Sequence, residues 1–255
     1  MSELPMARDA GGARLGRRVL VLAGGVALAL AATASALSRQ QSTKRTTPGV
    51  VYTFGDSILD CGHYNPYGVT PGGLLVQNDD RLFPEFHGRD LSSRGPARLE
   101  HRARDGATVA TLAAQARGLA PESGEAAVAL VTIGGNDLLQ GLIADRGGGM
   151  DAFRAALDAF LRDLPVRPVL LGNVYDPTFG DDSRNFLAVD PALARANQRR
   201  MMAVHAQLGA RYGQLVDLHA HFLRGDPSWF VHTIEPSLRG ASEVRHAFLE
   251  ALALG

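Results

Sequence analysis

A serine, a glycine and an asparagine of this sequence each stand just after a segment with the pattern of a β-strand. They are Ser57, Gly106 and Asn136. A hydroxyl nucleophile combined with amide donors directed at an oxygen that becomes negative is the set of groups that acyl transfer requires. The pattern therefore predicts a serine ester hydrolase, with Ser57 as the nucleophile.

The segments around these residues alternate between strand and helix patterns. Strands are predicted at residues 50–54, 98–104, 126–133, 168–172 and 214–218, of which 98–104 is charged and suits a sheet edge. Helices are predicted at residues 108–117, 151–164 with Asp151 as the cap, 191–209 and 242–252. Such alternation indicates an α/β fold, with a parallel sheet covered by helices on both faces and ligands beyond the carboxyl ends of its strands. We therefore expect the three residues to meet at that edge.

Composition narrows the class of protein. The 255 residues are 45% hydrophobic, with 26 basic and 26 acidic side chains, which indicates a soluble globular domain and no nucleic-acid partner. The single cysteine, Cys61, excludes an intrachain disulfide and is interpreted as a packing residue. We expect no cofactor and no metal, because Asp217, His219 and His221 alone are a weak metal signal.

The N-terminus has the order of a secretory signal. Arg14, Arg17 and Arg18 precede an uncharged apolar run at 19–37, which ends in small residues with the spacing of a cleavage site. Residues 1–38 are predicted to be a signal peptide or, alternatively, an N-terminal membrane anchor spanning 19–37. Residues 39–49 are then a linker and residues 50–255 the folded domain. We expect an exported protein, whether secreted, periplasmic or held at the cell surface.

A long connection at residues 62–90 separates the first two predicted strands. It carries aromatic and leucine side chains among proline and glycine. Two interpretations stay open: a mobile lid over the site, or a connection packed on the core.

Three sequence blocks resemble the SGNH hydrolase superfamily, also called GDSL lipases and esterases. TFGDSILD at 53–60 is similar to the first block, DGAT at 105–108 to the second and IGGNDL at 133–138 to the third. The resemblance implies a three-layer α/β/α, flavodoxin-like fold with a central, mostly parallel sheet. It implies an oxyanion hole formed by the Ser57 and Gly106 N–H groups and the Asn136 amide. Asp56 and Asp137 would hold loops.

The fourth block departs from the family pattern of an aspartate, two spacers and a histidine followed by proline. If Pro236 and Gly240 anchor the match, Glu235 stands in place of the catalytic histidine and His232 in place of its aspartate. If His232 is taken as the histidine, Trp229 occupies the aspartate position. Serine needs a base at neutral pH, and imidazole is best suited to that task.

Several side chains are therefore candidates for the general base. His232 ranks first, oriented by Glu235 or Asp226, and Glu235 itself is another candidate. His219 or His221, interpreted mainly as a loop pair, could also supply the imidazole.

The substrate is expected to be a small-molecule, glycan or lipid ester. Its acyl and alcohol parts and the oligomeric state are left open by the sequence. Two alternatives are a catalytically impaired protein of the same fold that binds an acylated or glycan ligand, and an acyltransferase that uses the same serine.

Overall fold

The computed structural model describes residues 47–121 and 124–253. The described residues belong to one compact unit, Thr47–Gly255. The predicted leader and most of the predicted linker lie outside the described residues.

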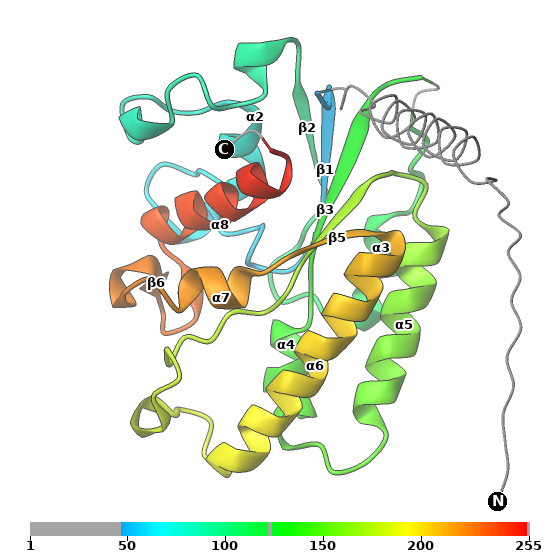
Figure 1. The fold of residues 1–255 in the computed structure, drawn as a ribbon, viewed down its shortest axis with the longest axis vertical. Coiled ribbons are helices and arrows are strands. Elements are labelled where there is room, and N and C mark those ends of the chain that lie inside the picture. Colours follow the sequence, from blue (N-terminus) through cyan, green and yellow to red (C-terminus); the bar gives the residue numbers. More distant parts are fainter. Residues whose placement is uncertain (1–46, 122–123, 254–255) are drawn as a thin grey trace, which may run out of the picture. The chain divides into compact units, whose positions relative to one another are not determined.

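A five-stranded parallel sheet forms the centre of this unit (Figure 1). Its order is β2 (Arg98–His101), β1 (Val50–Gly55), β3 (Ala127–Thr132), β4 (Val169–Gly172) and β5 (Gly213–Val216). The central strands β1, β3 and β4 are almost wholly buried, whereas the charged strand β2 lies at an edge, as its sequence predicts. The register pairs Gly55 with Thr132 and Thr132 with Gly172, so these three strands end level with one another.

Helices cover both faces of the sheet and complete the predicted three-layer α/β/α fold (Figure 1). One apolar core beneath the sheet is shared with α3 (Leu112–Gln115), α5 (Gly149–Asp163) and α6 (Pro191–Tyr212). The other core is shared with α2 (Pro71–Val76), α7 (Leu218–Phe222) and α8 (Leu238–Ala251). The short helix α4 (Gly135–Leu139) follows β3 directly. Strand–helix alternation thus predicted the class of fold correctly.

The starts of two helices differ from the prediction. Helix α5 begins at Gly149, with Gly148 as its cap, so Asp151 lies in the first turn and the prediction that it is the cap is wrong. Helix α8 begins at Leu238 rather than 242, because the Ser237 hydroxyl accepts the Gly240 N–H. The predicted loop pair His219 and His221 lies in helix α7 instead.

The connection at residues 62–90 is packed on the core. Leu74, Leu75 and Phe86 are buried there, against α8 and its neighbours. Arg245 of α8 is also buried; its guanidinium lies 3.4 Å from the centre of the Phe86 ring and donates a hydrogen bond to Asn78 Oδ1 at 2.9 Å. Burial lowers the pKa of Arg245 to about 10. This charged anchor and the apolar packing support the packed interpretation over the lid.

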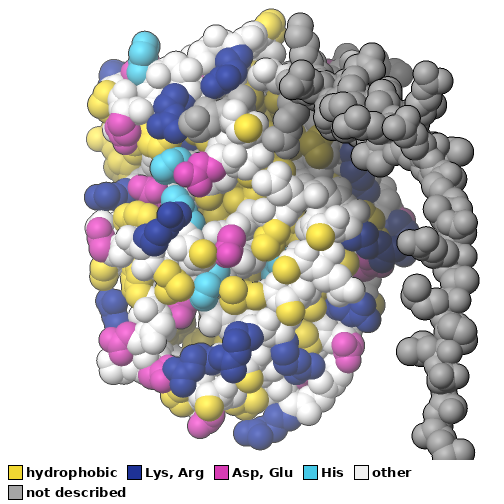
Figure 2. Space-filling view, viewed as in Figure 1, with side chains coloured by type: hydrophobic (Ala, Val, Ile, Leu, Met, Phe, Trp, Pro, Cys, Tyr) yellow, Lys and Arg dark blue, Asp and Glu magenta, His cyan; other side chains and the backbone are white. Residues whose placement is uncertain are grey.

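The surface is mixed in character. Basic, acidic and hydrophobic side chains all occur on the face in Figure 2, and neither sign of charge covers it. Across residues 47–121 and 124–253, no helix combines the length and apolar character needed to cross a membrane.

Candidate active site

Ser57 lies in a tight turn directly after β1 and is 8% exposed. Gly55, the last residue of β1, has a φ of +124°, and a Cβ there would lie 1.6 Å from the Thr132 carbonyl oxygen. Only glycine permits this close approach of β1 to β3. The buried Gln115 side chain accepts the Gly55 N–H at 2.7 Å and donates to the Gly55 carbonyl at 2.8 Å. Both backbone polar groups of Gly55 are therefore held, which fixes the start of the turn that presents Ser57.

Asp56 ties this turn to the neighbouring strand. Its Oδ1 accepts the Ile58 N–H at 3.2 Å and the Thr132 hydroxyl at 2.9 Å. Burial raises the pKa of Asp56 to about 7, although these hydrogen bonds oppose the increase. Its partners are those of a residue that holds the loop.

Asn136 and Gly106 are brought together by a hydrogen bond between their loops. The Asn136 Nδ2 donates to the Ala107 carbonyl at 3.0 Å, and the amide carries a second N–H that can donate to a substrate oxygen. Gly106 precedes Ala107 and has a φ of +73°. Asp137 accepts the Val109 N–H at 3.1 and 3.2 Å, which fixes the same two loops.

A small hairpin decides which residue of the fourth block approaches Ser57. Its strands are β6 (Phe230–Val231) and β7 (Glu235–Pro236), paired antiparallel. His232 and Thr233 form the tip, with φ values of +47° and +74°. This left-handed tip places the His232 ring 5.8 Å from that of Tyr64, whereas Glu235 lines the pocket that contains Ser57. The structure thus brings Glu235, and not His232, into the pocket with the serine.

The Glu235 carboxyl has the environment of a base. The Ser57 hydroxyl lies near this carboxyl in the same pocket, and the Glu235 Oε2 is buried and has no hydrogen-bond partner among the described residues. Burial raises the pKa of Glu235, the nearby Ser57 hydroxyl lowers it as a hydrogen-bond donor within reach, and Asp105 raises it through its negative charge. His63 and His232 lower it through their positive charge. A carboxylate whose pKa is shifted toward neutrality is a better proton acceptor than an ordinary glutamate.

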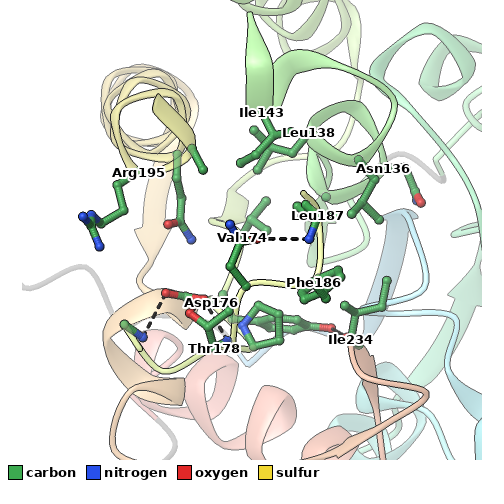
Figure 3. A pocket seen from close by; sticks show the side chains of 18 of the residues that line it. Asn136, Leu138, Ile143, Val174, Asp176, Thr178, Phe186, Leu187, Arg195 and Ile234 are labelled. Atoms are coloured by element: carbon green, nitrogen blue, oxygen red, sulfur yellow. Dashed lines mark hydrogen bonds between the residues drawn. The ribbon is translucent and has the colours of Figure 1, made fainter. Parts of the chain in front are cut away.

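A largely apolar pocket opens at Ser57. It occupies about 980 Å³, including space open to solvent. Figure 3 shows Leu138, Ile143, Val174, Phe186 and Leu187 around this space, with Asn136 and Ile234 at one side and Arg195 at the other. The polar groups at one end are thus Ser57, Asn136 and Glu235, and the remainder of the wall is mostly hydrocarbon.

The other histidine candidates lie elsewhere. Neither His219 nor His221 lines the pocket of Ser57. His221, Glu243 and His246 form a group whose ligand-type atoms lie within 4.8 Å of one another, the spacing of a metal site. However, Arg224 donates to His221 Nδ1 at 3.1 Å, so the Nε2 of a neutral His221 carries the hydrogen and donates to Glu243 at 3.0 Å. Both ring nitrogens of His221 are thus hydrogen-bonded within the protein, and His246 Nδ1 lies 3.6 Å from the same Glu243 carboxylate.

Cys61 is fully buried in the core near the site. Burial raises the pKa of its thiol to about 12, so it stays protonated and is not a nucleophile at neutral pH. This agrees with its interpretation as a packing residue.

Two residues that hold the active-site loops in place were not predicted from the sequence. Gln115 holds Gly55, and the Tyr175 hydroxyl donates to the Ile234 carbonyl at 2.7 Å, directly before Glu235. Gln115 lies on a helix without a motif, and Tyr175 follows β4 in a segment without periodicity. Neither carries a local signal, because each acts on a partner that is about 60 residues away.

Solved structures share the fold at low sequence identity. An α/β hydrolase enzyme from the metagenome of Lake Arreo, Spain, is 24% identical, with a TM-score of 0.57; the match covers 82% of this chain and 98% of that one. An acetylxylan esterase from Geobacillus stearothermophilus is 20% identical, with a TM-score of 0.57 over 82% of this chain and 96% of that one. No curated protein matches the chain.

The family comparison covers most of the chain, including all four blocks. The model of the GDSL-like Lipase/Acylhydrolase family matches residues 53–241, from the strand before Ser57 to the first turn of α8. This agrees with the resemblance seen in the first three blocks and with the α/β/α fold. The chain therefore belongs to the GDSL-like lipase/acylhydrolase family, whose members hydrolyse ester bonds.

Proposed function

We propose that this protein hydrolyses carboxylic esters through an acyl-enzyme on Ser57, with Glu235 as the general base. The observation that carries the proposal is that Ser57, Glu235 and Asn136 line one pocket, with the Ser57 hydroxyl near enough to the Glu235 carboxyl to lower its pKa. A nucleophile, its base and an oxyanion donor thus share one space.

The chemistry follows from these positions. Glu235 takes the Ser57 proton as Oγ attacks the ester carbonyl carbon. The negative oxygen receives hydrogen bonds from the Asn136 amide and from the N–H groups of Ser57 and Gly106. The tetrahedral intermediate collapses, and Glu235 returns the proton to the departing alcohol. A water molecule, deprotonated by Glu235, then attacks the acyl-enzyme; the second tetrahedral intermediate collapses, Glu235 returns the proton to Ser57 Oγ, and the carboxylic acid leaves.

Hydrolysis of p-nitrophenyl acetate tests the proposal. Residues 47–255 are expected to turn the ester over, and Ser57→Ala is expected to lose nearly all of that rate. A fluorophosphonate probe is expected to label the wild type and not Ser57→Ala. If no ester gives a Ser57-dependent rate and the probe fails to label, hydrolysis is rejected in favour of a protein of this fold that binds an acylated ligand.

We also propose that the protein is exported. The support is the sequence order of arginines, apolar run and small residues over 14–37. Expression of the full chain with a C-terminal tag, followed by intact-mass measurement, distinguishes the forms. Cleavage near Ala36 supports a signal peptide, retention of the segment in a membrane fraction supports an anchor, and an uncleaved cytosolic chain refutes export.

A further inference from the structure

The pocket beside Ser57 extends well beyond the reacting groups. Its far wall comes from the connection between β4 and α6 and from the first turns of α6. Apolar side chains on several elements face this space, namely Leu138, Leu139, Ile143, Val174, Phe186 and Leu187. This empty space, which includes a part open to solvent, is bordered by many more side chains than an acetyl group on Ser57 could contact.

The mouth of the pocket also exposes hydrocarbon. Four large hydrophobic side chains are notably exposed among the described residues: Tyr67, Leu139, Phe186 and Leu223. Two of them, Leu139 at 38% and Phe186 at 43%, belong to this pocket. Exposed apolar groups that continue the wall of an apolar cavity indicate a surface for an apolar ligand.

The charged side chains at the far end of the pocket are hydrogen-bonded to other groups of the protein. The Arg195 guanidinium there is hydrogen-bonded to the Asp182 carboxylate. Asp176 accepts hydrogen bonds from the Thr178 N–H and hydroxyl at 2.9 and 2.7 Å. With its polar groups paired, this end suits a neutral chain.

Glu235 borders a different environment outside the pocket. Asp105 accepts hydrogen bonds from Tyr64 at 2.8 Å and His63 at 3.1 Å, and the His232 ring lies beside that of Tyr64. Asp105, His63 and His232 change the pKa of Glu235 through their charges, and Tyr64 lies beside them. None of these four polar residues lines the pocket. An ester bound at Ser57 therefore meets hydrocarbon on one side and polar groups on the other.

The departing alcohol must receive a proton from Glu235, and this requirement decides whether the acyl half or the alcohol half of the ester faces the apolar pocket. The departing alcohol must lie close to Glu235, next to the polar group of residues, to recover its proton. We propose that the apolar pocket binds an unbranched, medium-chain acyl group and that the alcohol faces the polar side, an inference that rests on the proposed function. The substrates are then esters of medium-chain fatty acids rather than acetates.

The test is a series of p-nitrophenyl esters from acetate to dodecanoate. We expect kcat/KM to rise about fourfold for each methylene that the pocket buries and to reach a maximum between hexanoate and decanoate. In a second series of acetates, lengthening an alkyl alcohol should change kcat/KM far less. A flat acyl series, or a gain with alcohol length instead, overturns the assignment.

A matched pair of variants on α6 locates the effect. Ala194 lines the pocket, whereas Ala203 is exposed on the same helix and does not. Ala194→Phe should lower the octanoate-to-acetate ratio of kcat/KM at least tenfold, and Ala203→Phe should leave the ratio at the wild-type value. Equal ratios in the two variants contradict the proposal.

Binding separates this inference from the proposed function. Octanamide, a neutral analogue of the acyl part, should bind Ser57→Ala in calorimetry, and adding Ala194→Phe should weaken the affinity at least tenfold. If Ser57-dependent hydrolysis is absent but this binding is found, the pocket assignment stands without the reaction. If acetate is hydrolysed through Ser57 while octanamide does not bind, only the acyl-chain inference fails.

Discussion

Replacing Glu235 with glutamine tests the unusual base of this site. Glutamine has the shape of glutamate and keeps an amide group in place of the carboxylate, but it cannot take a proton at neutral pH. A positioned general base contributes roughly 10²- to 10⁴-fold, or about 3–5 kcal/mol of transition-state stabilisation. We expect kcat/KM for p-nitrophenyl acetate to fall by that factor in Glu235→Gln.

His232→Gln is the matched control, because His232 lies at the hairpin tip outside the pocket. We expect its kcat/KM at neutral pH to stay within about threefold of wild type, since a neighbouring charge at a partly exposed position is screened by solvent. A loss of 100-fold or more in His232→Gln, with Glu235→Gln near wild type, would refute the carboxylate base.

The pH profile gives an independent check. The base acts when ionised, so kcat/KM should rise with pH through the pKa of Glu235, which burial raises above its ordinary value of 4.5. His232 lowers this pKa and Asp105 raises it through their charges. His232→Gln should therefore move the acidic limb to higher pH and Asp105→Asn to lower pH. Shifts of the same sign in both variants would contradict the assignment.

Three further predictions concern the oxyanion donor, the buried carboxyl and the hairpin. Asn136→Ala should lower kcat by roughly 10²- to 10³-fold with little change in KM, since it removes a donor to the negative oxygen; equal losses of substrate affinity would argue against this role. The pKa of Asp56 rises on folding from 3.8 to about 7, so wild type should lose up to about 4 kcal/mol of unfolding free energy relative to Asp56→Asn as pH rises from 4 to 7, as measured by urea titration; parallel curves would contradict the shift. Gly240→Ala would place a Cβ 2.1 Å from the Trp229 carbonyl oxygen and should destabilise the fold by about 1–3 kcal/mol, whereas a Cβ at Gly147 meets only Asp145 Oδ1, at 3.8 Å, so Gly147→Ala should be nearly neutral in thermal unfolding.

Local sequence patterns determined the framework of the active site. Ser57, Gly106 and Asn136 each follow a strand, and parallel strands end at one edge, so their meeting depends only on the order of elements. The buried strands β1, β3 and β4 were recognisable because a strand covered on both faces requires a continuous apolar run. The start of α8 was less predictable, because the Ser237 hydroxyl sets it by accepting the Gly240 N–H rather than through side-chain spacing.

The tertiary structure alone decided the base and the pocket. Glu235 and His232 are three residues apart, and the left-handed backbone at the hairpin tip, with the Tyr175 anchor before Glu235, selects which one enters the pocket. The packing of residues 62–90 likewise depends on Arg245, far away in sequence. The pocket wall comes from the aperiodic β4–α6 connection. Sequence patterns report the interactions of a residue with its chain neighbours, whereas these features arise from contacts between segments that only folding brings together.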